Sequence, residues 1–493
     1  MNNLETAEHP EKLRRVAIDP VSRVEGHGKV TLLLDENNKV HQVRLHIVEF
    51  RGFEKFIQGR PYWEVPVMVQ RLCGICPVSH HIAASKAMDM MLGVEHLTPT
   101  AEKNRRLMHY GQIMQSHALH FFHLCSPDLL FGFDSEVARR NIVGVAAEYP
   151  DIAKQGVLLR KFGQEVIRMT AGKRIHGTGA IPGGVNKSLS REERDALLAE
   201  VYRMIAWSRE AVHLVRRLFE QNLQEYNAFG RFRAHQLSIV RADGAMDLYH
   251  GGLRARGMDG DIIFDHYDYR HYWDVISEDV KSWSYMKFPF LRSLGPETGW
   301  YRVGPLTRVV NCDFIPTSFA EKERREFLAF DDGRATGSTL GFHWARMIEM
   351  LHAVESIKDL LHDDDIMGEQ LMATGERGGR GVGVIEAPRG TLIHHYRVDE
   401  NDLVIRANLI VSTTHNNQAM NEAVRRVAMQ YLDGNEITEG LLNHIEVAIR
   451  AFDPCLSCAT HALGKMPLEV ELLDMEGNLV DRLMRSSDGV ITA

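Results

Sequence analysis

Two Cys-x-x-Cys pairs near opposite ends of the chain constrain its fold more than any other feature. Cys73 and Cys76 form the first pair, Cys455 and Cys458 form the second, and together they hold four of the six cysteines. Four soft sulfur ligands select metals such as zinc, nickel, copper(I) or iron over magnesium or calcium. If both pairs bind one metal site, the two ends of this 493-residue chain must converge. We therefore predict one compact unit rather than separable domains.

A structural zinc site and a redox-active pair are simpler interpretations of these cysteines. Zinc ribbons and fingers usually close their four ligands within a few dozen residues, because the metal replaces a core that a short chain lacks. This chain is long and 44% hydrophobic, so it can bury a large core without such a metal. A thioredoxin-like site uses one pair at a helix start in a βαβ unit, which leaves the second pair without a role. The other cysteines, Cys125 and Cys312, are expected to be buried, unreactive thiols.

Charge and hydropathy argue against two classes of partner. Lysine and arginine total 58 against 66 acidic residues, and the formal charge of -8 offers no basic surface for nucleic acid or anionic membranes. The chain has no run of eighteen apolar residues that could span a membrane, and residues 1–15 lack the apolar core of a signal peptide. Few cysteines, gathered in pairs, fit a reducing compartment better than a disulfide framework. We expect a soluble, cytoplasmic protein that binds neither nucleic acid nor membranes.

Amphipathic segments with recognisable caps predict a core of long helices. The Ser190-x-x-Glu193 capping box begins one of them. Asp453-Pro454 ends the last predicted helix, so the second cysteine pair lies just after a helix end. The first pair lies just before a helix start, where the helix dipole favours thiolates. Apolar spacing, caps and prolines predict helices over 77–91, 99 to about 124, 190 to about 221, 339–361, 417–432 and 438 to about 451.

The predicted β structure is smaller and peripheral. Residues 29–34 and 40–48 alternate in polarity around a turn-like segment and predict a hairpin. Residues 232–312 are mixed and are interpreted as a short-stranded insertion, and 468–473 and 479–483 predict two strands near the C-terminus. The expected fold is thus predominantly α with smaller β parts, an α+β fold in which a long-helix bundle carries an N-terminal hairpin and peripheral strands.

The residues around both cysteine pairs resemble those of a known enzyme family. The first pair lies in RLCGICPVSHH (71–81) and the second in DPCLSCATH (453–461). Both motifs, at these positions, are similar to those of the large, nickel-carrying subunit of [NiFe]-hydrogenases. The segments 48–55, 283–289 and 303–306 resemble the soluble, NAD-linked bidirectional group, and the likeness extends over nearly the whole chain. The resemblance implies an [NiFe]-hydrogenase-like fold and the reversible splitting of dihydrogen into protons and electrons.

The resemblance also implies a nickel-iron centre with a role for each cysteine. Cys73 and Cys455 would be terminal nickel ligands, and Cys76 and Cys458 would bridge the nickel to an iron that carries carbon monoxide and cyanide. A thiolate can take the first proton, and Glu25 would pass it on, since its counterpart in the family hydrogen-bonds the cysteine that matches Cys455. Considered without the family, Glu25 is an ordinary surface or capping carboxylate.

A second group of residues is expected around the diatomic ligands of the iron. The glycine-rich segment 375–383 lacks a full phosphate-loop signature and is interpreted as a route that brings Arg389 close to an anion. By resemblance, Arg389 lies over the metal centre and donates to a cyanide, a role that suits a guanidinium because it stays charged when desolvated. Thr413 matches a hydroxyl donor to the other cyanide, and Pro388 and Asp453 are expected beside them.

A magnesium site and one missing carboxylate complete the family comparison. Glu54, the carbonyl of Leu409 and His461 match the residues that hold a magnesium in many relatives, although an imidazole is an unusual magnesium ligand. Ser116 stands where membrane-bound relatives have an aspartate near the catalytic arginine. That departure weakens any proton relay through a second carboxylate. Four histidines are individually expected to be core or surface residues rather than ligands: His117, His120, His394 and His395.

The same resemblance implies partner proteins. The chain has no convincing dinucleotide fingerprint and no spare cysteines for iron-sulfur clusters, so electrons must leave through another subunit. In the family, a small iron-sulfur subunit docks on the large one, and diaphorase subunits that contain FMN and iron-sulfur clusters reduce NAD. A maturation endopeptidase cuts after the histidine that matches His461. Residues 1–461 would then be the mature catalytic unit, and 462–493 a maturation peptide whose retention marks an immature precursor.

Three other interpretations fit parts of the sequence. A non-enzymatic docking or quinone-lining subunit, as in the complex I relatives, would lack the four cysteines. A hydrogen-sensing regulatory subunit would keep the same ligands, with slow turnover and a regulatory kinase partner. A zinc-stapled docking module would contain zinc and neither nickel nor iron.

Overall fold

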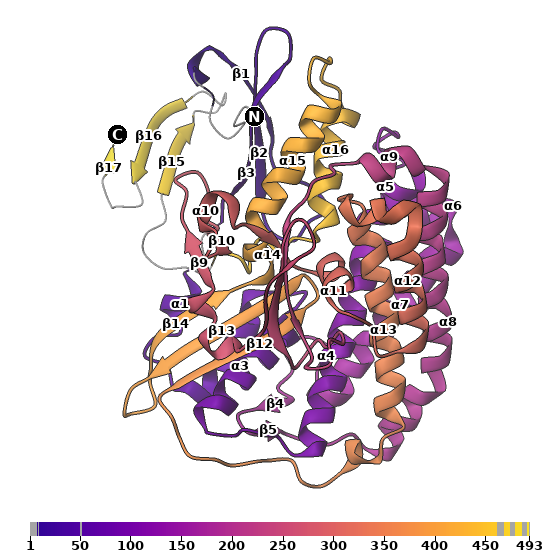
Figure 1. Cartoon of the computed structure of the whole chain (residues 1–493), viewed down its shortest axis with the longest axis vertical. Coiled ribbons are helices and arrows are strands. Elements are labelled where there is room, and N and C mark those ends of the chain that lie inside the picture. Colours follow the sequence, from indigo (N-terminus) through magenta and orange to yellow (C-terminus); the bar gives the residue numbers. More distant parts are fainter. Residues whose placement is uncertain are drawn as a thin grey trace.

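The computed structural model describes residues 7, 9–49, 52–460, 468–473, 479–485 and 491–492. A bundle of long helices occupies one side of the molecule, and small sheets with their covering helices occupy the other (Figure 1). The predicted α+β class, with helices dominant, is confirmed.

Four long helices form the bundle: α4 (Pro99–Leu119), α7 (Pro150–Ala171), α8 (Arg191–Gln221) and α13 (Gly341–Leu361). Two of them begin at the predicted caps, because Thr98 accepts from the N–H of Ala101 and Ser190 forms a capping box with Glu193. Helix α13 is buried along most of its length and is the centre of the bundle. Shorter helices pack around these four: α5 (Ser126–Phe131), α6 (Ile142–Glu148), α9 (Leu223–Ala228), α11 (Pro305–Asn311) and α12 (Ser318–Ala329).

An antiparallel sheet and one helix form the platform beside the bundle. The sheet consists of β12 (Arg380–Ala387), β13 (Gly390–Val398) and β14 (Val404–Ile410), and helix α3 (Pro77–Met91) packs on it. A Cβ atom would lie 1.9 Å from a carbonyl oxygen of α3 at Gly381 and 2.1 Å from another at Gly383. These glycines of the sequence segment 375–383 therefore allow close helix-sheet packing. The tight turn after β12 then carries Arg389.

The predicted N-terminal hairpin is present and is extended by a third strand. The sheet contains β1 (Arg14–Ile18), β2 (Gly28–Leu34) and β3 (Val40–Ile47), all antiparallel. Helix α15 (Asn417–Tyr431) packs against β3, where the side chain of Asn421 accepts from the N–H of Leu45 at 2.9 Å. Segments from both ends of the chain are thus joined at this sheet (Figure 1).

Residues 232–312 contain short strands, as predicted. A four-stranded sheet has the order β11-β6-β7-β8, and β9 and β10 form a separate antiparallel pair. Buried residues of this segment, such as Leu237 and Leu253, share an apolar cluster with Val382 and Ile393 of the platform. The strands are β6 (His235–Val240), β7 (Gly252–Arg256), β8 (Ile262–Tyr267), β9 (Ile276–Asp279), β10 (Phe288–Leu291) and β11 (Tyr301–Arg302).

The helix predicted from residue 99 to about 124 is present but changes type near its C-terminal end. Helix α4 ends at Leu119 and continues as a π-helical turn, His120–Cys125, before α5 begins. Pro127 at the start of α5 cannot donate a backbone hydrogen bond and disfavours an uninterrupted α-helix. Cys125 lies in this turn with its Sγ 3.1 Å from Nε2 of His120, and burial raises the pKa of its thiol. Cys312 is likewise buried, and burial raises the pKa of its thiol to about 12.

The C-terminal helices and strands follow the predicted order. Helix α16 (Glu439–Ala451) begins after the Thr438 cap, and β15 (Leu468–Leu473), β16 (Leu479–Arg485) and β17 (Ile491–Thr492) form an antiparallel sheet. Across the described ranges, no helix is both long and apolar enough to cross a membrane. The remaining short elements are α1 (Phe53–Phe56), α2 (Val65–Met68), α10 (Gly295–Thr298), α14 (Ser412–His415), β4 (Ala180–Ile181) and β5 (Gly184–Val185).

Candidate metal centre

The four paired cysteines meet in one buried cluster. All four Sγ atoms lie within 4.8 Å of one another. The Sγ of Cys455 is 3.1 Å from that of Cys73 and 2.7 Å from that of Cys458, and the Sγ atoms of Cys76 and Cys458 are 3.9 Å apart. None of these cysteines forms a disulfide. The predicted convergence of the two pairs therefore occurs in the folded chain.

Local backbone structure aims each pair at the cluster. Cys76 is the N-cap of α3, and Cys73 Sγ accepts hydrogen bonds from the N–H groups of Ile75 and Cys76, each at 3.2 Å. Cys455 follows the end of α16, where Asp453 adopts a positive φ of 55° that turns the chain away from the helix axis. The first pair thus lies at a helix start, as the sequence predicts, where the helix dipole stabilises negative charge.

The cluster fits a soft transition metal on its donor chemistry. Burial raises the pKa of the Cys455 and Cys458 thiols well above the usual range. Burial also opposes ionisation of Cys73, yet hydrogen bonds from the other three thiols lower its pKa. Four thiolates packed this closely repel one another in a low-dielectric interior, so a cation is required to hold all four deprotonated. Sulfur donors of this kind suit nickel, iron or zinc.

Glu25 connects this cluster to the protein exterior. Its Oε2 lies 3.0 Å from Cys455 Sγ and accepts from the N–H of Ser457 at 3.2 Å, while its Oε1 accepts from the Ser457 hydroxyl at 2.5 Å. The backbone pairs with the same segment, because the carbonyl of Glu25 accepts from the N–H of Leu456. The carboxylate is only partly buried, whereas the thiol it contacts is 1% exposed. A proton could therefore pass from Cys455 to Glu25 over one hydrogen bond.

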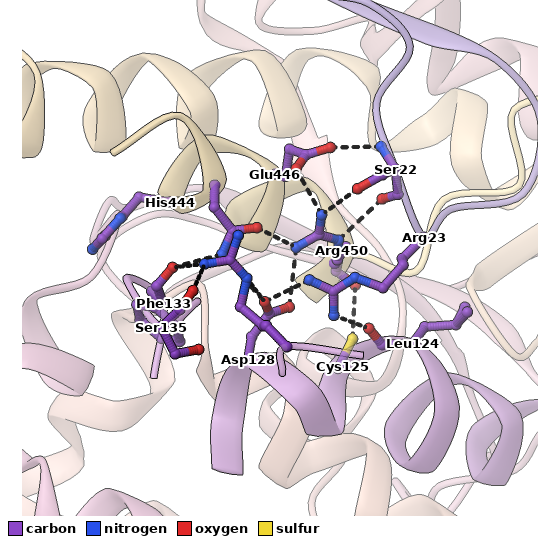
Figure 2. Close-up of polar contacts among 12 residues, drawn as sticks. Ser22, Arg23, Leu124, Cys125, Asp128, Phe133, Ser135, His444, Glu446 and Arg450 are labelled. Atoms are coloured by element: carbon purple, nitrogen blue, oxygen red, sulfur yellow. Dashed lines mark hydrogen bonds and ion pairs between the residues drawn. The ribbon is translucent and has the colours of Figure 1, made fainter. Parts of the chain in front are cut away.

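An ion network holds the segment that carries Glu25. Arg450 donates to Asp128, Glu446 and Ser22, at 2.8–3.0 Å (Figure 2). Arg23 donates to the same Asp128 at 2.6 Å and to the carbonyl of Leu124 at 2.8 Å. Burial by itself would raise the pKa of Asp128, but the guanidinium groups of Arg450 and Arg23 lower it. The N-terminal loop is thereby tied to α16, to the π-helical turn at 120–125 and to α5.

Arg389 lies beside the cluster as the resemblance implied. Its Nε donates to the carbonyl of Asp453 at 2.5 Å and its Nη2 to the carboxylate at 2.9 Å, while Nη1 is 3.4 Å from the hydroxyl of Ser116. Against the effect of burial, Asp453 and the nearby cysteines raise the pKa of Arg389 well above its usual range. Ser116 therefore meets the guanidinium with a neutral hydroxyl.

Pro388 and Thr413 border a small cavity next to the thiols. Cys76, Cys455 and Arg389 line the same cavity. The Thr413 oxygen accepts from the N–H of Cys455 at 3.0 Å, which leaves its hydroxyl proton free to donate into the cavity. The space is enclosed by apolar groups and a few polar donors, an arrangement that suits small ligands bound to a metal.

Two of the three residues expected to bind magnesium lie next to each other. The N–H of Leu409 donates to the buried carboxylate of Glu54 at 2.8 Å. His461 lies outside the described residues, and so does the bond to Ala462 that the expected endopeptidase would cut.

Sequence reasoning missed two polar groups near the cluster. His80 lines the small cavity, and its Nδ1 is 3.1 Å from Nε2 of His394, which in turn contacts the Tyr396 hydroxyl at 2.6 Å. Ser457 was also overlooked, although it binds Glu25. Only the position of this serine inside the second motif, directly before Cys458, could have indicated Ser457. No sequence signal links His80 to His394, because the fold alone brings them together.

A buried ion cluster lies deeper in the bundle. Arg308 donates to Glu349 at 2.6 Å and to Glu386 at 2.7 Å, and His117 Nε2 is 2.9 Å from Glu349. Against the effect of burial, Arg308 and His117 lower the pKa of Glu349 to about 2. His117 is therefore a core residue, in agreement with the prediction for it, and its partner is a carboxylate that the sequence did not single out.

Comparison with known proteins agrees with the sequence resemblance. The sequence model of the family described as nickel-dependent hydrogenase matches residues 51–131 and 245–461, and a model described as HoxL-like matches 15–50. The chain is 49% identical to the NAD-reducing hydrogenase HoxS subunit beta of Cupriavidus necator, over 96% of this chain and 100% of that protein. It is 41% identical to a subunit of the F420-non-reducing hydrogenase of Methanothermobacter thermautotrophicus, over 95% and 100%.

Solved structures show the same fold. A crystal structure of an NAD+-reducing [NiFe]-hydrogenase in the H2-reduced state superposes with a TM-score of 0.90 at 60% identity, covering 91% of this chain and 99% of that one. The Ni-Fe-Se hydrogenase from D. vulgaris Hildenborough shares the fold with a TM-score of 0.74 at 24% identity, covering 91% and 100%. The predicted family and enzyme class are confirmed. This chain belongs to the nickel-dependent hydrogenases, as a large subunit of that family.

Proposed function

We propose that this chain is the catalytic subunit of a hydrogenase that reversibly splits dihydrogen at a nickel-iron centre held by Cys73, Cys76, Cys455 and Cys458. The observation that carries the proposal is the burial of all four Sγ atoms within 4.8 Å of one another. The retained cysteines argue against a non-catalytic docking subunit. Membership of the nickel-dependent family favours nickel and iron over a structural zinc.

Such a centre would supply the metal chemistry that cleaves dihydrogen heterolytically and carries the electrons. The protein residues bind it and move the proton. Cys455 is the first proton acceptor, and Glu25 takes the proton over the 3.0 Å contact and releases it toward solvent. Arg389 and Thr413 direct N–H and O–H donors at the small cavity, where cyanide ligands of the iron would be held. Pro388 and Asp453 shape and orient this side of the site.

A partner complex follows from the relatives. The chain is similar to subunits of NAD-reducing hydrogenases, so we propose that electrons pass through a small iron-sulfur subunit and FMN-containing diaphorase subunits to NAD in the cytoplasm. The sequence itself offers no cysteines beyond the two pairs for iron-sulfur clusters except the separate, buried Cys125 and Cys312.

Two further assignments belong to the same proposal. Glu54, the Leu409 carbonyl and His461 would hold a magnesium ion. The proximity of the Glu54 carboxylate to the backbone of Leu409 is consistent with this assignment. Residues 1–461 would form one mature catalytic unit that includes 232–312, and an endopeptidase would remove 462–493 after metal insertion. A chain that retains its tail would then lack an active centre.

The test combines infrared spectroscopy with metal analysis of the natively expressed, purified complex. We expect bands of iron-bound carbon monoxide and cyanide that shift under hydrogen, together with nickel and iron in the protein. Cys455→Ser should abolish both signals, while Cys312→Ala, a change at a buried cysteine outside the cluster, should leave them. Zinc in place of nickel and iron in fully processed protein would refute the proposal, and bands with very slow turnover would indicate a sensor.

A further inference from the structure

A large cavity on the side of the molecule formed by residues 231–337 and helix α15 has no place in the proposed hydrogenase reaction. Its volume is about 780 Å³, within the range of pockets that bind small molecules. None of the residues proposed for the metal centres lines it. The cavity is strongly basic, because Glu422 is the one acidic residue on its wall. The lining arginines are Arg231, Arg233, Arg256, Arg302 and Arg426.

Arg302 is the unusual member of this set. Arg302 is only 3% exposed. Its Nε and Nη1 atoms are buried without a hydrogen-bond partner among the described residues. The guanidinium lies over two aromatic rings, 5.3 Å from the ring centre of Phe232 and 6.0 Å from that of Phe342. A buried cation without an acceptor is costly, unless a ligand supplies the missing acceptor.

Other buried arginines of this protein show what Arg302 lacks. Arg105 is paired with Asp89, Arg308 with Glu349 and Glu386, and Arg450 with Asp128 and Glu446. Burial with no neighbouring carboxylate lowers the pKa of Arg302 to about 10, so the side chain still carries its charge at neutral pH. Arg346 is also buried without an ion pair, but it donates to the carbonyls of Phe342 and Ala451. Among the buried arginines of the described residues, Arg302 alone therefore lacks a hydrogen-bond acceptor.

The surrounding guanidinium groups leave the cavity with excess positive charge. The exposed side chain of Arg231 forms no ion pair with the described residues, and Arg256 donates to the carbonyl of Gly260, a neutral acceptor. Arg233 pairs with Asp259, and Arg426 donates to Glu422 at 2.7 Å. Glu422 also accepts from Arg425, so it is not available to neutralise Arg302.

We propose that this cavity binds a small phosphate-bearing anion whose phosphoryl oxygens accept hydrogen bonds from Arg302. A phosphoryl group presents several oxygens and up to two negative charges, which match several guanidinium forks better than a single carboxylate does. The cavity is also larger than one inorganic phosphate needs, and Trp300 on its wall offers an aromatic surface beside the arginines. A nucleotide, with its ring near Trp300, and free phosphate are the two sources of this chemistry.

Binding can be measured on the purified hydrogenase complex by isothermal titration calorimetry in a phosphate-free buffer. The probes are inorganic phosphate and AMP, which carry the same phosphoryl group with and without a planar ring. We expect saturable binding at one site per large subunit. Tighter binding of AMP identifies a nucleotide as the source, and equal binding identifies free phosphate. Absence of saturable binding by both probes overturns the proposal.

Variants connect the binding to the cavity. Arg302→Met should weaken binding at least tenfold, and Arg231→Gln, a change at an exposed and unpaired side chain, should weaken it severalfold without affecting folding. Arg203→Gln on α8, which lies outside the cavity, is the matched control and should bind as the parent does. Dihydrogen-dependent activity of each variant reports whether the subunit is folded and loaded, independently of the probe. Unchanged binding in both cavity variants would contradict the assignment.

Discussion

At the scale of single residues, the chemistry of a side chain here is set by neighbours that are distant in the sequence. Glu25 gains a proposed catalytic role because a thiol from the other end of the chain lies 3.0 Å away. Arg389 is held beside the cysteine cluster because Asp453 accepts two of its N–H groups. The same residue types elsewhere in the chain form ordinary surface ion pairs, such as that between Arg233 and Asp259.

Replacement of the Glu25 carboxylate tests its role as proton acceptor. Glu25→Gln keeps the size of the side chain and can still contact Cys455 and Ser457, but it cannot take up a proton. We expect dihydrogen oxidation to fall about 10²–10⁴-fold while the nickel and iron contents stay unchanged, because general acid-base groups contribute on that order. Activity assays with metal analysis measure both quantities.

The control for this substitution is Glu400→Gln, a change at an exposed carboxylate in the turn before β14. It should leave activity and metal content unaltered. Loss of metal from the Glu25→Gln protein would indicate a structural role for Glu25 and would contradict proton transfer.

At the scale of elements, close approaches and anchoring contacts determine where the loops of the site lie. The loop that carries Glu25 passes so near the second cysteine motif that one residue must be glycine. Gly26 has a φ of +82°, and a Cβ there would lie 2.7 Å from the backbone nitrogen of Ser457. The network around Arg450 then fixes the preceding residues of the loop (Figure 2).

Gly26→Ala tests the close approach of this loop. Positive φ alone costs a residue with a Cβ about 1 kcal/mol, and the clash with Ser457 adds to that cost. We expect a loss of about 2–4 kcal/mol in the free energy of unfolding, measured by urea denaturation, and lower activity.

Gly434→Ala separates the two contributions. Gly434 has a similar φ of +78° but no atom within 4 Å of a Cβ, so only the backbone cost of about 1 kcal/mol applies. Equal destabilisation by the two substitutions would show that the contact with Ser457 is unimportant.

Removal of the Arg450 guanidinium tests the anchoring network. Arg450→Met keeps the apolar stem but leaves Asp128 and Glu446 without a buried partner. Breaking a buried ion pair in this way costs on the order of 3–5 kcal/mol. Urea denaturation should show this loss, whereas Arg216→Met, which breaks a half-exposed pair on α8, should change stability by about 1 kcal/mol or less. A small effect at Arg450 would mean that Arg23 alone holds the loop.

At the scale of the whole molecule, the helix bundle and platform exclude water from many titratable groups. Burial lowers the pKa of His109 and His352 to about 4 and of His415 to about 3. These histidines stay neutral in the folded protein at pH values where they would already be charged in an unfolded chain. The folded state therefore binds fewer protons than the unfolded state between about pH 4 and 6.5.

Stability should decrease as the pH falls from about 6.5 to about 4. Each such histidine contributes a slope of up to about 1.4 kcal/mol per pH unit, because the unfolded state binds the proton that the folded state excludes. Urea midpoints at pH 7.5 and 5.5 measure the effect. His352→Gln should reduce the slope and the exposed His271→Gln should not. A stability that stays constant over this range would contradict the burial argument.

Local signals in the sequence determined much of the architecture. The caps at Thr98 and Ser190, the alternating hairpin and the helix-ending Asp453-Pro454 act over a few residues, so their structures could be predicted. The π-helical turn at 120–125 could not be predicted in this way, because it depends on how α4 and α5 pack. The packing function of the glycines at 381 and 383 also required the helix that lies against them.

By itself, the sequence determined the kind of site: two pairs of soft sulfur ligands, in a family-specific setting, in a chain with enough apolar residues for a large core. The tertiary structure alone decided the contacts that make the site work and the place where a second ligand would bind. Segments far apart in the sequence form three of these features. They are the contact between Glu25 and Ser457, the contact between the side chains of His80 and His394, and the unpaired guanidinium of Arg302. Such contacts follow from long-range packing, which residue spacing does not encode.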